Sequence, residues 1–292
     1  MPPTATQTIR VGHSPDPDDA FMFYAMTQGK IPMPGVQVEH VLEDIETLNQ
    51  RAVRGELEVT AFSLHAYAYC AAHYKILTSG TSMGDGYGPI VVTAKPMTSE
   101  EFLKKGQSPA GTVPFSVAIP GRLTTAALVL RLWAGAVKTT ILPFDQILPA
   151  VRDGRVAAGI LIHEGQLTYA GEGLTKVVDL GEWWLKTTGL PLPLGVNGVR
   201  RDLPEALQGE ISRTMRRSIA YAMAHRPEAL AYAQRYGRGL DTPRTDRFVG
   251  MYVNHWTEEC GPKGRDAMAL VLAKAVEHGI LPARCEPEFV RE

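Results

Sequence analysis

Two spacings of apolar residues alternate along the first 90 residues of the chain. Runs in which every residue or every second residue is apolar predict strands at 8–12, 36–42 and 58–63. Segments with apolar residues three or four positions apart predict helices at 18–28, 45–55 and 64–73. A loop with four glycines at 80–88 then leads into a strand at 89–94. We therefore expect a pattern in which strands alternate with helices.

The same order begins again after a connection at 95–112, which contains a short helix. The pattern predicts strands at 116–119, 139–144 and 157–163, with helices at 125–134 and 145–154. Segments 44–63 and 145–163 share one plan, in which an acidic cap, an amphipathic helix and a glycine precede a buried strand. Two interpretations stay open: two domains of one plan face each other, or βαβ units simply look alike.

The last third of the chain changes character. After an apolar strand at 194–199, helices are predicted at 204–224, 226–236, 244–255 and 263–278, and we expect this tail to pack on the first domain. The fold class is α/β with mostly parallel sheets. We predict a larger domain at 1–94 plus 200–292 and a smaller one at 95–199. Crossings near 92–97 and 195–200 would leave a ligand cleft between the domains, as in type II periplasmic binding proteins.

Composition narrows the range of partners. The 292 residues include 45% hydrophobic and 21% charged ones, and the formal net charge is -1, so bulk charge does not favour nucleic acid or an anionic membrane. The N-terminus lacks a secretory pattern, and no apolar run approaches membrane-spanning length. Cys70, Cys260 and Cys285 show no metal-like spacing and suit reduced thiols. We expect a cytoplasmic protein without nucleic-acid or membrane partners; the sequence leaves a homodimer open.

In open α/β sheets, ligands bind outside the carboxyl ends of the strands. The predicted strand ends deliver four polar segments to that edge: Ser14–Asp19, Ser63, Pro120–Thr125 and His163. Because segments 44–63 and 145–163 follow the same plan, Ser63 and His163 occupy corresponding strand ends. The sequence therefore predicts that these segments form two walls of one cleft, which would hold a small anionic metabolite.

The Pro120–Thr125 turn opens a helix with two threonines in its first turn. Free backbone N–H groups and the helix dipole favour an anion there, by roughly 0.3–1 kcal/mol for the dipole. Thr124 and Thr125 could add hydrogen bonds to a carboxylate. A plain cap by Thr124 would explain the same residues.

His163 ends an apolar strand, which makes it a candidate general base, because a neutral imidazole accepts a proton near pH 7. A structural histidine in the core would leave the same pattern. Three aspartates at 16, 18 and 19 suit a helix start; Mg²⁺ would suit them too, but no second carboxylate cluster accompanies them. We therefore expect no metal.

Two further features have open interpretations. Asn49 lies within a predicted helix, where asparagine is mildly unfavourable, so either a polar task or solvent exposure explains it. Trp183 and Trp184 precede an apolar segment that could wall the cleft or act as a hinge.

Seven segments together resemble one enzyme family: SPDPDDAFMFYAM, EDIETLN, GYGPIVV, PGRLTTA, ILIHEGQLTY, VVDLGEWW and TGLPLPLG. In this order they resemble 1,4-dihydroxy-6-naphthoate synthases of the futalosine route to menaquinone, over about residues 8–280. The resemblance implies a type II binding-protein fold used for catalysis. It also implies cleavage of cyclic dehypoxanthinyl futalosine into the dihydroxynaphthoate and a sugar-derived fragment, with no cofactor.

The resemblance assigns roles to single residues. His163 of the IHE motif would be the general base. The other matching positions would bind substrate, and the last three of them would hold its carboxylate: Asn49, Ser63, Thr124, Thr125 and Ala126.

One loop departs from the family pattern, which usually reads Ser-Pro-Cys-Pro-Asn-Asp-Thr-Phe. Asp16, Asp18 and Ala20 replace the cysteine, asparagine and threonine. The two added carboxylates would repel an anionic substrate unless they point away from it.

Two other functions stay open. One is a non-catalytic solute-binding protein of the same fold, against which the missing export and lipidation signals count. The other is the related enzyme that dehydrates chorismate, against which the IHEG and ETLN segments count.

Overall fold

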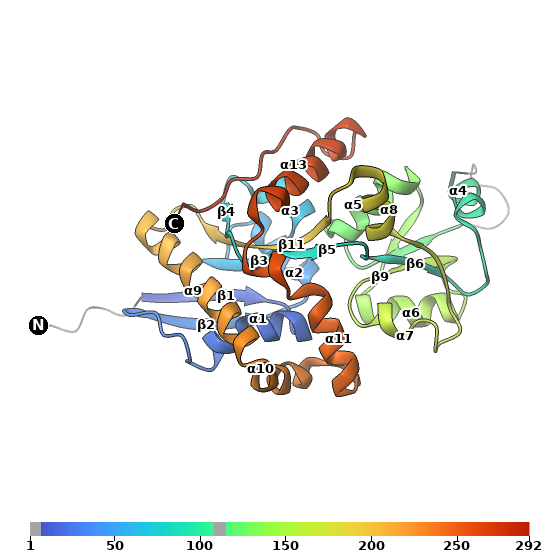
Figure 1. The fold of residues 1–292 in the computed structure, drawn as a ribbon. Helices are drawn as coiled ribbons and strands as arrows, with labels where there is room; N and C mark the ends of the chain where they lie inside the picture. Colours follow the sequence, from blue (N-terminus) through green and yellow to red (C-terminus); the bar gives the residue numbers. More distant parts are fainter. Residues whose placement is uncertain (1–6, 108–114, 292) are drawn as a thin grey trace, which may run out of the picture.

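The computed structural model describes residues 7–107 and 115–291, which form two sheets flanked by helices (Figure 1). The first sheet has the order β2-β1-β3-β11-β4, and β5 also pairs with β11. Its strands are β1 (Gln7–His13), β2 (Val36–Leu42), β3 (Val59–Ser63), β4 (Tyr74–Ile76), β5 (Ser82–Gly84) and β11 (Leu192–Arg200).

The second sheet has the order β10-β6-β9-β7-β8. Its strands are β6 (Ile90–Thr93), β7 (Val117–Ile119), β8 (Thr139–Ile141), β9 (Ala158–Leu161) and β10 (Thr175–Asp179). The central strands β7 and β9 are buried along their whole length, because helices cover both of their faces.

The helices of the two α/β parts mostly follow the predicted ranges. They are α1 (Pro17–Thr27), α2 (Ile45–Val53), α3 (Leu64–Cys70), α4 (Ser99–Gln107), α5 (Thr125–Ala134), α6 (Phe144–Arg152), α7 (Gly165–Thr168) and α8 (Leu180–Thr188). Residues 108–112 of the predicted connection lie outside the described residues.

The tail is helical, as predicted: α9 (Glu205–Ala224), α10 (Arg226–Ala233), the 3₁₀ turn η1 (Gln234–Tyr236), α11 (Thr242–Tyr252), α12 (His255–Glu258) and α13 (Gly261–Glu277). Helix α9 packs along α1, where Ser218 Oγ donates to the Met22 carbonyl at 2.8 Å. The next helices lead toward the second sheet, so that α11 lies at the junction of the two parts (Figure 1).

The expectation of mostly parallel sheets is wrong. Strand β11 runs antiparallel to β3, β4 and β5, and β6 runs antiparallel to β9 and β10. These are the strands by which the chain enters each sheet from the other. Neither strand reaches its sheet through a crossover helix from a strand of the same sheet, so the βαβ rule, which gives parallel neighbours, does not apply to them.

Strand pairing puts both crossings earlier than the predicted positions. Residues 90–93 pair within the second sheet, so the first crossing lies between β5 and β6. Leu192 already pairs with Gly84 of the first sheet, so the second crossing lies between α8 and β11. The apolar runs at these positions were recognisable as strands, but periodicity does not say which sheet a strand joins.

Trp183 and Trp184 lie on α8, which the apolar pattern did not predict as a helix. Asp179 caps this helix by accepting from the Gly181 and Glu182 N–H groups, and Gly189 ends it with φ 74°. Trp184 is buried in a core cluster that contains residues from both sheets. Neither tryptophan lines the pocket described below.

Among residues 7–107 and 115–291, no helix combines the length and apolar character needed to cross a bilayer.

Candidate active site

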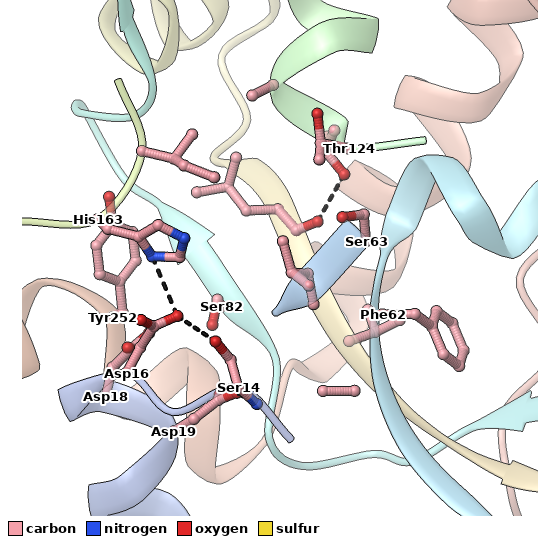
Figure 2. Close-up of a pocket in the computed structure, with 18 of the residues that line it drawn as sticks. Ser14, Asp16, Asp18, Asp19, Phe62, Ser63, Ser82, Thr124, His163 and Tyr252 are labelled. Atoms are coloured by element: carbon pink, nitrogen blue, oxygen red, sulfur yellow. Dashed lines mark hydrogen bonds and ion pairs between the residues drawn. The ribbon is translucent and has the colours of Figure 1, made fainter. Parts of the chain in front are cut away.

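A pocket of about 770 Å³, which includes its open mouth, lies between the two sheets. The first sheet contributes the ends of β1 and β3, and the second contributes the segments after β7 and β9 (Figure 2). Five of the six residues assigned from sequence line it: Ser63, Thr124, Thr125, Ala126 and His163. Asn49 is fully buried and does not line it.

His163 lies two positions after the end of β9 and adopts a left-handed backbone conformation, with φ 70°. A non-glycine residue in this region is strained, and such strain persists only where contacts hold it. The ring packs edge-on against Phe144, with centroids 4.6 Å apart. Its Nδ1 lies 3.2 Å from Asp16 Oδ2, and its other nitrogen faces the pocket interior (Figure 2). His163 is thus a pocket residue with a carboxylate behind it.

Asp16 occupies the N-cap position of α1, but its side chain does not cap the helix. The carboxylate is only 2% exposed and has three polar partners. Ser14 Oγ donates to Oδ2, which also faces His163, and Arg238 Nη1 lies 2.7 Å from Oδ1. Asp16 therefore joins the first sheet to the imidazole of the second.

Asp18 and Asp19 also line the pocket, and burial weakens their ionisation. Desolvation, together with the nearby Asp16 charge, raises the pKa of Asp18 to about 6. Desolvation and the neighbouring Asp18 raise the pKa of Asp19 well above its usual range. Asp19 accepts the Ser14 N–H at 2.7 Å, which fixes the loop. The pocket thus carries less negative charge than three aspartates would suggest.

Asn49 acts on the pocket through Ser63. Its Oδ1 accepts the Ser63 backbone N–H at 2.8 Å, and its Nδ2 donates to Ser63 Oγ at 3.1 Å. Helix α2 presents this amide because Asp44 caps its start by accepting from the Glu46 and Thr47 N–H groups. Asn49 is therefore in this helix to orient Ser63 by hydrogen bonding, and not because the position is exposed to solvent.

The start of α5 forms the opposite end of the pocket. Thr124 caps the helix by accepting the Ala127 N–H at 3.2 Å and donates to the Gly121 carbonyl. Thr125 donates to the Leu194 carbonyl of β11 at 2.6 Å. Both hydroxyls are thus used within the protein, whereas the first N–H groups of a helix have no partner within it and remain suited to an anion.

The turn before α5 also receives a carboxylate from the other wall. Leu123 donates its N–H to Glu46 Oε2 at 3.2 Å, and Glu46 also accepts from Asn49. A Cβ at Gly121 would lie 2.2 Å from the same oxygen, so a larger residue there would displace the Glu46 carboxylate. The contact ties α2 to the α5 turn across the cleft.

We refer to Asp16, Asp18 and Asp19 as the acidic end of the pocket, and to Ser63, Thr124 and Thr125 as its hydroxyl end. Figure 2 shows the acidic end beside His163, and Ser63 and Thr124 of the hydroxyl end on the other side of the cavity. A ligand that spans the pocket would thus meet carboxylates and an imidazole at one end, and hydroxyls with a helix start at the other.

Sequence reasoning did not single out several pocket residues. Asp16 was expected in the cleft wall, as a cap, a metal ligand or a source of repulsion, but not as the partner of His163. Gln166 and Tyr252, whose side chains hydrogen-bond each other at 2.8 Å, close the pocket beside His163. Tyr252 comes from the tail, whose helical pattern gives no sign of a site. Within the described part of the chain, no group of three or more His, Cys, Asp or Glu side chains is arranged to hold a metal ion.

Comparison with known proteins gives relatives over nearly the full length. The chain is 42% identical to a 1,4-dihydroxy-6-naphthoate synthase of Thermus thermophilus, over 97% of this chain and 100% of the relative. It is 34% identical to a protein of the same name from Streptomyces coelicolor, over 96% of each chain.

Solved structures agree with the fold expected from sequence. A protein of Archaeoglobus fulgidus matches with a TM-score of 0.86 at 47% identity, covering 94% of this chain and 98% of that one. The alkanesulfonate-binding protein SsuA from Xanthomonas axonopodis matches with a TM-score of 0.69 at 12% identity, covering 96% of each chain. The chain therefore has the periplasmic-binding-protein-like fold, as predicted.

A family model described as menaquinone biosynthesis matches residues 9–277, which include every pocket residue described above. This match and the two curated relatives confirm the resemblance found in the sequence: the chain belongs to the menaquinone biosynthesis family.

Proposed function

We propose that the chain is a 1,4-dihydroxy-6-naphthoate synthase that cleaves a carbon–carbon bond in cyclic dehypoxanthinyl futalosine, with His163 as the general base. The observation that carries the proposal is the pairing of His163 with Asp16 at the wall of the pocket. The names of the two curated relatives, which match nearly full length, support the reaction.

The contact with Asp16 sets the proton positions on the imidazole. An ionised carboxylate only accepts hydrogen bonds, so Nδ1 carries the proton and Nε2 keeps a free lone pair. Nε2 faces the pocket interior, where it can take a proton from the substrate (Figure 2). Asp16 then stabilises the imidazolium that forms. A positioned base of this kind contributes about 10²–10⁴-fold to the rate.

The two ends of the pocket match the two ends of the proposed substrate. Its aromatic carboxylate would lie at the hydroxyl end, where the N–H groups at the start of α5 are suited to an anion. Its hydroxyl-bearing part would then lie at the acidic end, because carboxylates accept hydrogen bonds from hydroxyls. The ion pair with Arg238 and the raised pKa of Asp19 limit the repulsion between the acidic end and an anion.

The test is turnover of the purified protein. Mixed with cyclic dehypoxanthinyl futalosine, the protein should release 1,4-dihydroxy-6-naphthoate, followed by absorbance and identified by mass. Protein treated with EDTA and then desalted should keep its rate, because the proposed chemistry uses side chains alone.

Two results would contradict the proposal. Folded protein that neither binds nor converts the compound is not this enzyme. Protein that binds it tightly without forming product acts as a binding protein of the same fold.

A further inference from the structure

Arg238 lies in the loop between η1 and α11, yet its side chain meets both walls of the cleft. Its Nη1 is 2.7 Å from Asp16 Oδ1, and its Nη2 donates to the Pro15 carbonyl at 3.1 Å, both on the first wall. Nη1 also donates to Glu164 Oε1 at 3.2 Å, on the second wall directly after His163. One guanidinium thus bridges the two walls.

Arg238 also contacts the aromatic ring against which His163 packs. Its guanidinium carbon lies 4.4 Å from the centroid of Phe144, and Phe144 packs edge-on against the imidazole. The Arg238 guanidinium therefore contacts three residues that hold His163 in place: Asp16 at Nδ1, Glu164 next in the chain and the Phe144 ring.

The backbone gives a second, independent indication. Among residues 7–107 and 115–291, the non-glycine residues with positive φ are His163, at 70°, and Arg238, at 44°. Conformations of this kind persist where surrounding contacts determine them, and they concentrate at functional sites. The two residues are 75 positions apart in sequence and hold the same carboxylate, Asp16, from two sides.

The charges around His163 define what Arg238 does electrostatically. Asp16 and Asp18 of the first wall and Tyr252 of the tail lie beside the imidazole, and Arg238 pairs with Asp16 and with Glu164, the residue after His163. Arg238 is the cation of this group. It balances Asp16, a carboxylate that is 2% exposed, and it opposes a second positive charge on the ring.

We propose that Arg238 is a positioning residue for the reaction: by tying Asp16 to Glu164 across the cleft, it holds the His163 imidazole toward the pocket and opposes a second positive charge on the ring. The inference rests on the proposed function for its kinetic consequence. Its consequence for the imidazole does not depend on the identity of the substrate. A surface ion pair that only stabilises the fold would affect neither the charge state of the ring nor the chemical step.

The substrate-independent test is a histidine titration of the full chain by ¹H–¹⁵N NMR, with the His163 signal assigned by its absence from the His163→Gln protein. In Arg238→Met the guanidinium is lost and Asp16 is left without its cation, so the ring should hold its second proton to higher pH. We expect the titration midpoint to rise by at least about 0.5 pH unit. Arg238→Lys keeps the charge and should titrate near wild type.

The matched control is Arg235→Met, three residues earlier in the same tail, where the guanidinium lies over Tyr232 rather than at the pocket. This protein should titrate as wild type does. A wild-type midpoint in folded Arg238→Met would overturn the proposal, and so would an equal shift in Arg235→Met.

The kinetic test uses the same proteins and the proposed substrate. Arg238→Met should lose at least about 10-fold in kcat with little change in KM, and the acid limb of its kcat/KM profile should move to higher pH. Arg238→Lys should recover part of kcat, and Arg235→Met should keep all of it. A loss confined to KM would contradict a positioning role. If wild type itself does not turn over, the proposed function fails while the titration still decides the role of Arg238.

Discussion

At the scale of single residues, the site depends on one uncommon backbone conformation. His163 turns into the pocket because its φ is 70°, and its contacts with Asp16 and Phe144 hold it there. The sequence identified the histidine through its place after an apolar strand. It could not identify Asp16 as the partner, because that contact joins residues 147 positions apart on different sheets.

The backbone strain at His163 predicts a difference between two variants that both lack the imidazole. His163→Gly relieves the left-handed conformation, whereas His163→Ala retains it, at a cost of about 1–2 kcal/mol for a residue with a Cβ. We expect the glycine variant to be more stable by about 1 kcal/mol in urea unfolding. An alanine variant that equals or exceeds it would mean that the local strain is absent.

Asp18 makes a pH-dependent contribution to stability. Its pKa is raised to about 6 in the folded protein, so the stability it contributes is present at low pH and is lost as pH rises through about 6. An asparagine at this position cannot ionise, so Asp18→Asn does not lose this stability as the pH rises. The unfolding free energy of Asp18→Asn minus that of wild type should therefore be about 1 kcal/mol larger at pH 7.5 than at pH 5.

Asp266→Asn, on the exposed face of α13, is the control and should show no such trend. A gain for Asp18→Asn that does not change with pH would show that Asp18 is fully ionised throughout this range.

At the scale of elements, local signals identified most helices and strands, since periodicity and caps are properties of short segments. Helix α5 begins and ends at the predicted residues, Thr125 and Ala134. Helix α8 was not predicted, because its apolar residues merge with the strand that follows. Strand direction and sheet membership for β6 and β11 could not be predicted, because both depend on where the chain re-enters a sheet.

The link between α2 and β3 predicts that a residue outside the pocket matters to it. Asn49→Leu leaves the Ser63 N–H and hydroxyl without their partners, which should cost about 1–3 kcal/mol of stability. It should also raise KM, because Ser63 then loses its orientation. Unfolding curves and steady-state kinetics measure the two effects.

Gln28→Leu, at the exposed end of α1, is the control and should change stability by less than about 0.5 kcal/mol. If the two variants behave alike, the Asn49 amide does not support the pocket.

At the scale of the whole molecule, the pocket exists because two sheets and the tail meet. Contacts across the cleft include His163 with Asp16, Thr125 with Leu194, Glu46 with Leu123, Gln166 with Tyr252, and Arg238 with both walls. The sequence predicted the cleft from its two crossings. It gave no sign that the tail reaches the second wall, because the helical pattern of α11 fits packing on the first sheet equally well.

The bridge between Gln166 and Tyr252 predicts a modest effect on substrate affinity. Tyr252→Phe removes hydroxyl contacts at 2.8 and 3.1 Å and should weaken this part of the cleft by about 1 kcal/mol. We expect KM to rise about fivefold, with kcat within a factor of two. Tyr236→Phe removes a hydroxyl of the tail that hydrogen-bonds Tyr232, away from the pocket, and should leave KM unchanged; equal effects would argue against the bridge.

The central claim is that His163, held by Asp16, removes a proton as the carbon–carbon bond of the bound substrate is cleaved. Its most direct test is a single-turnover comparison of wild type and His163→Gln with excess enzyme over cyclic dehypoxanthinyl futalosine. We predict that both bind the compound, and that wild type forms 1,4-dihydroxy-6-naphthoate at least about 100-fold faster. Equal rates of product formation by the two proteins would contradict the account.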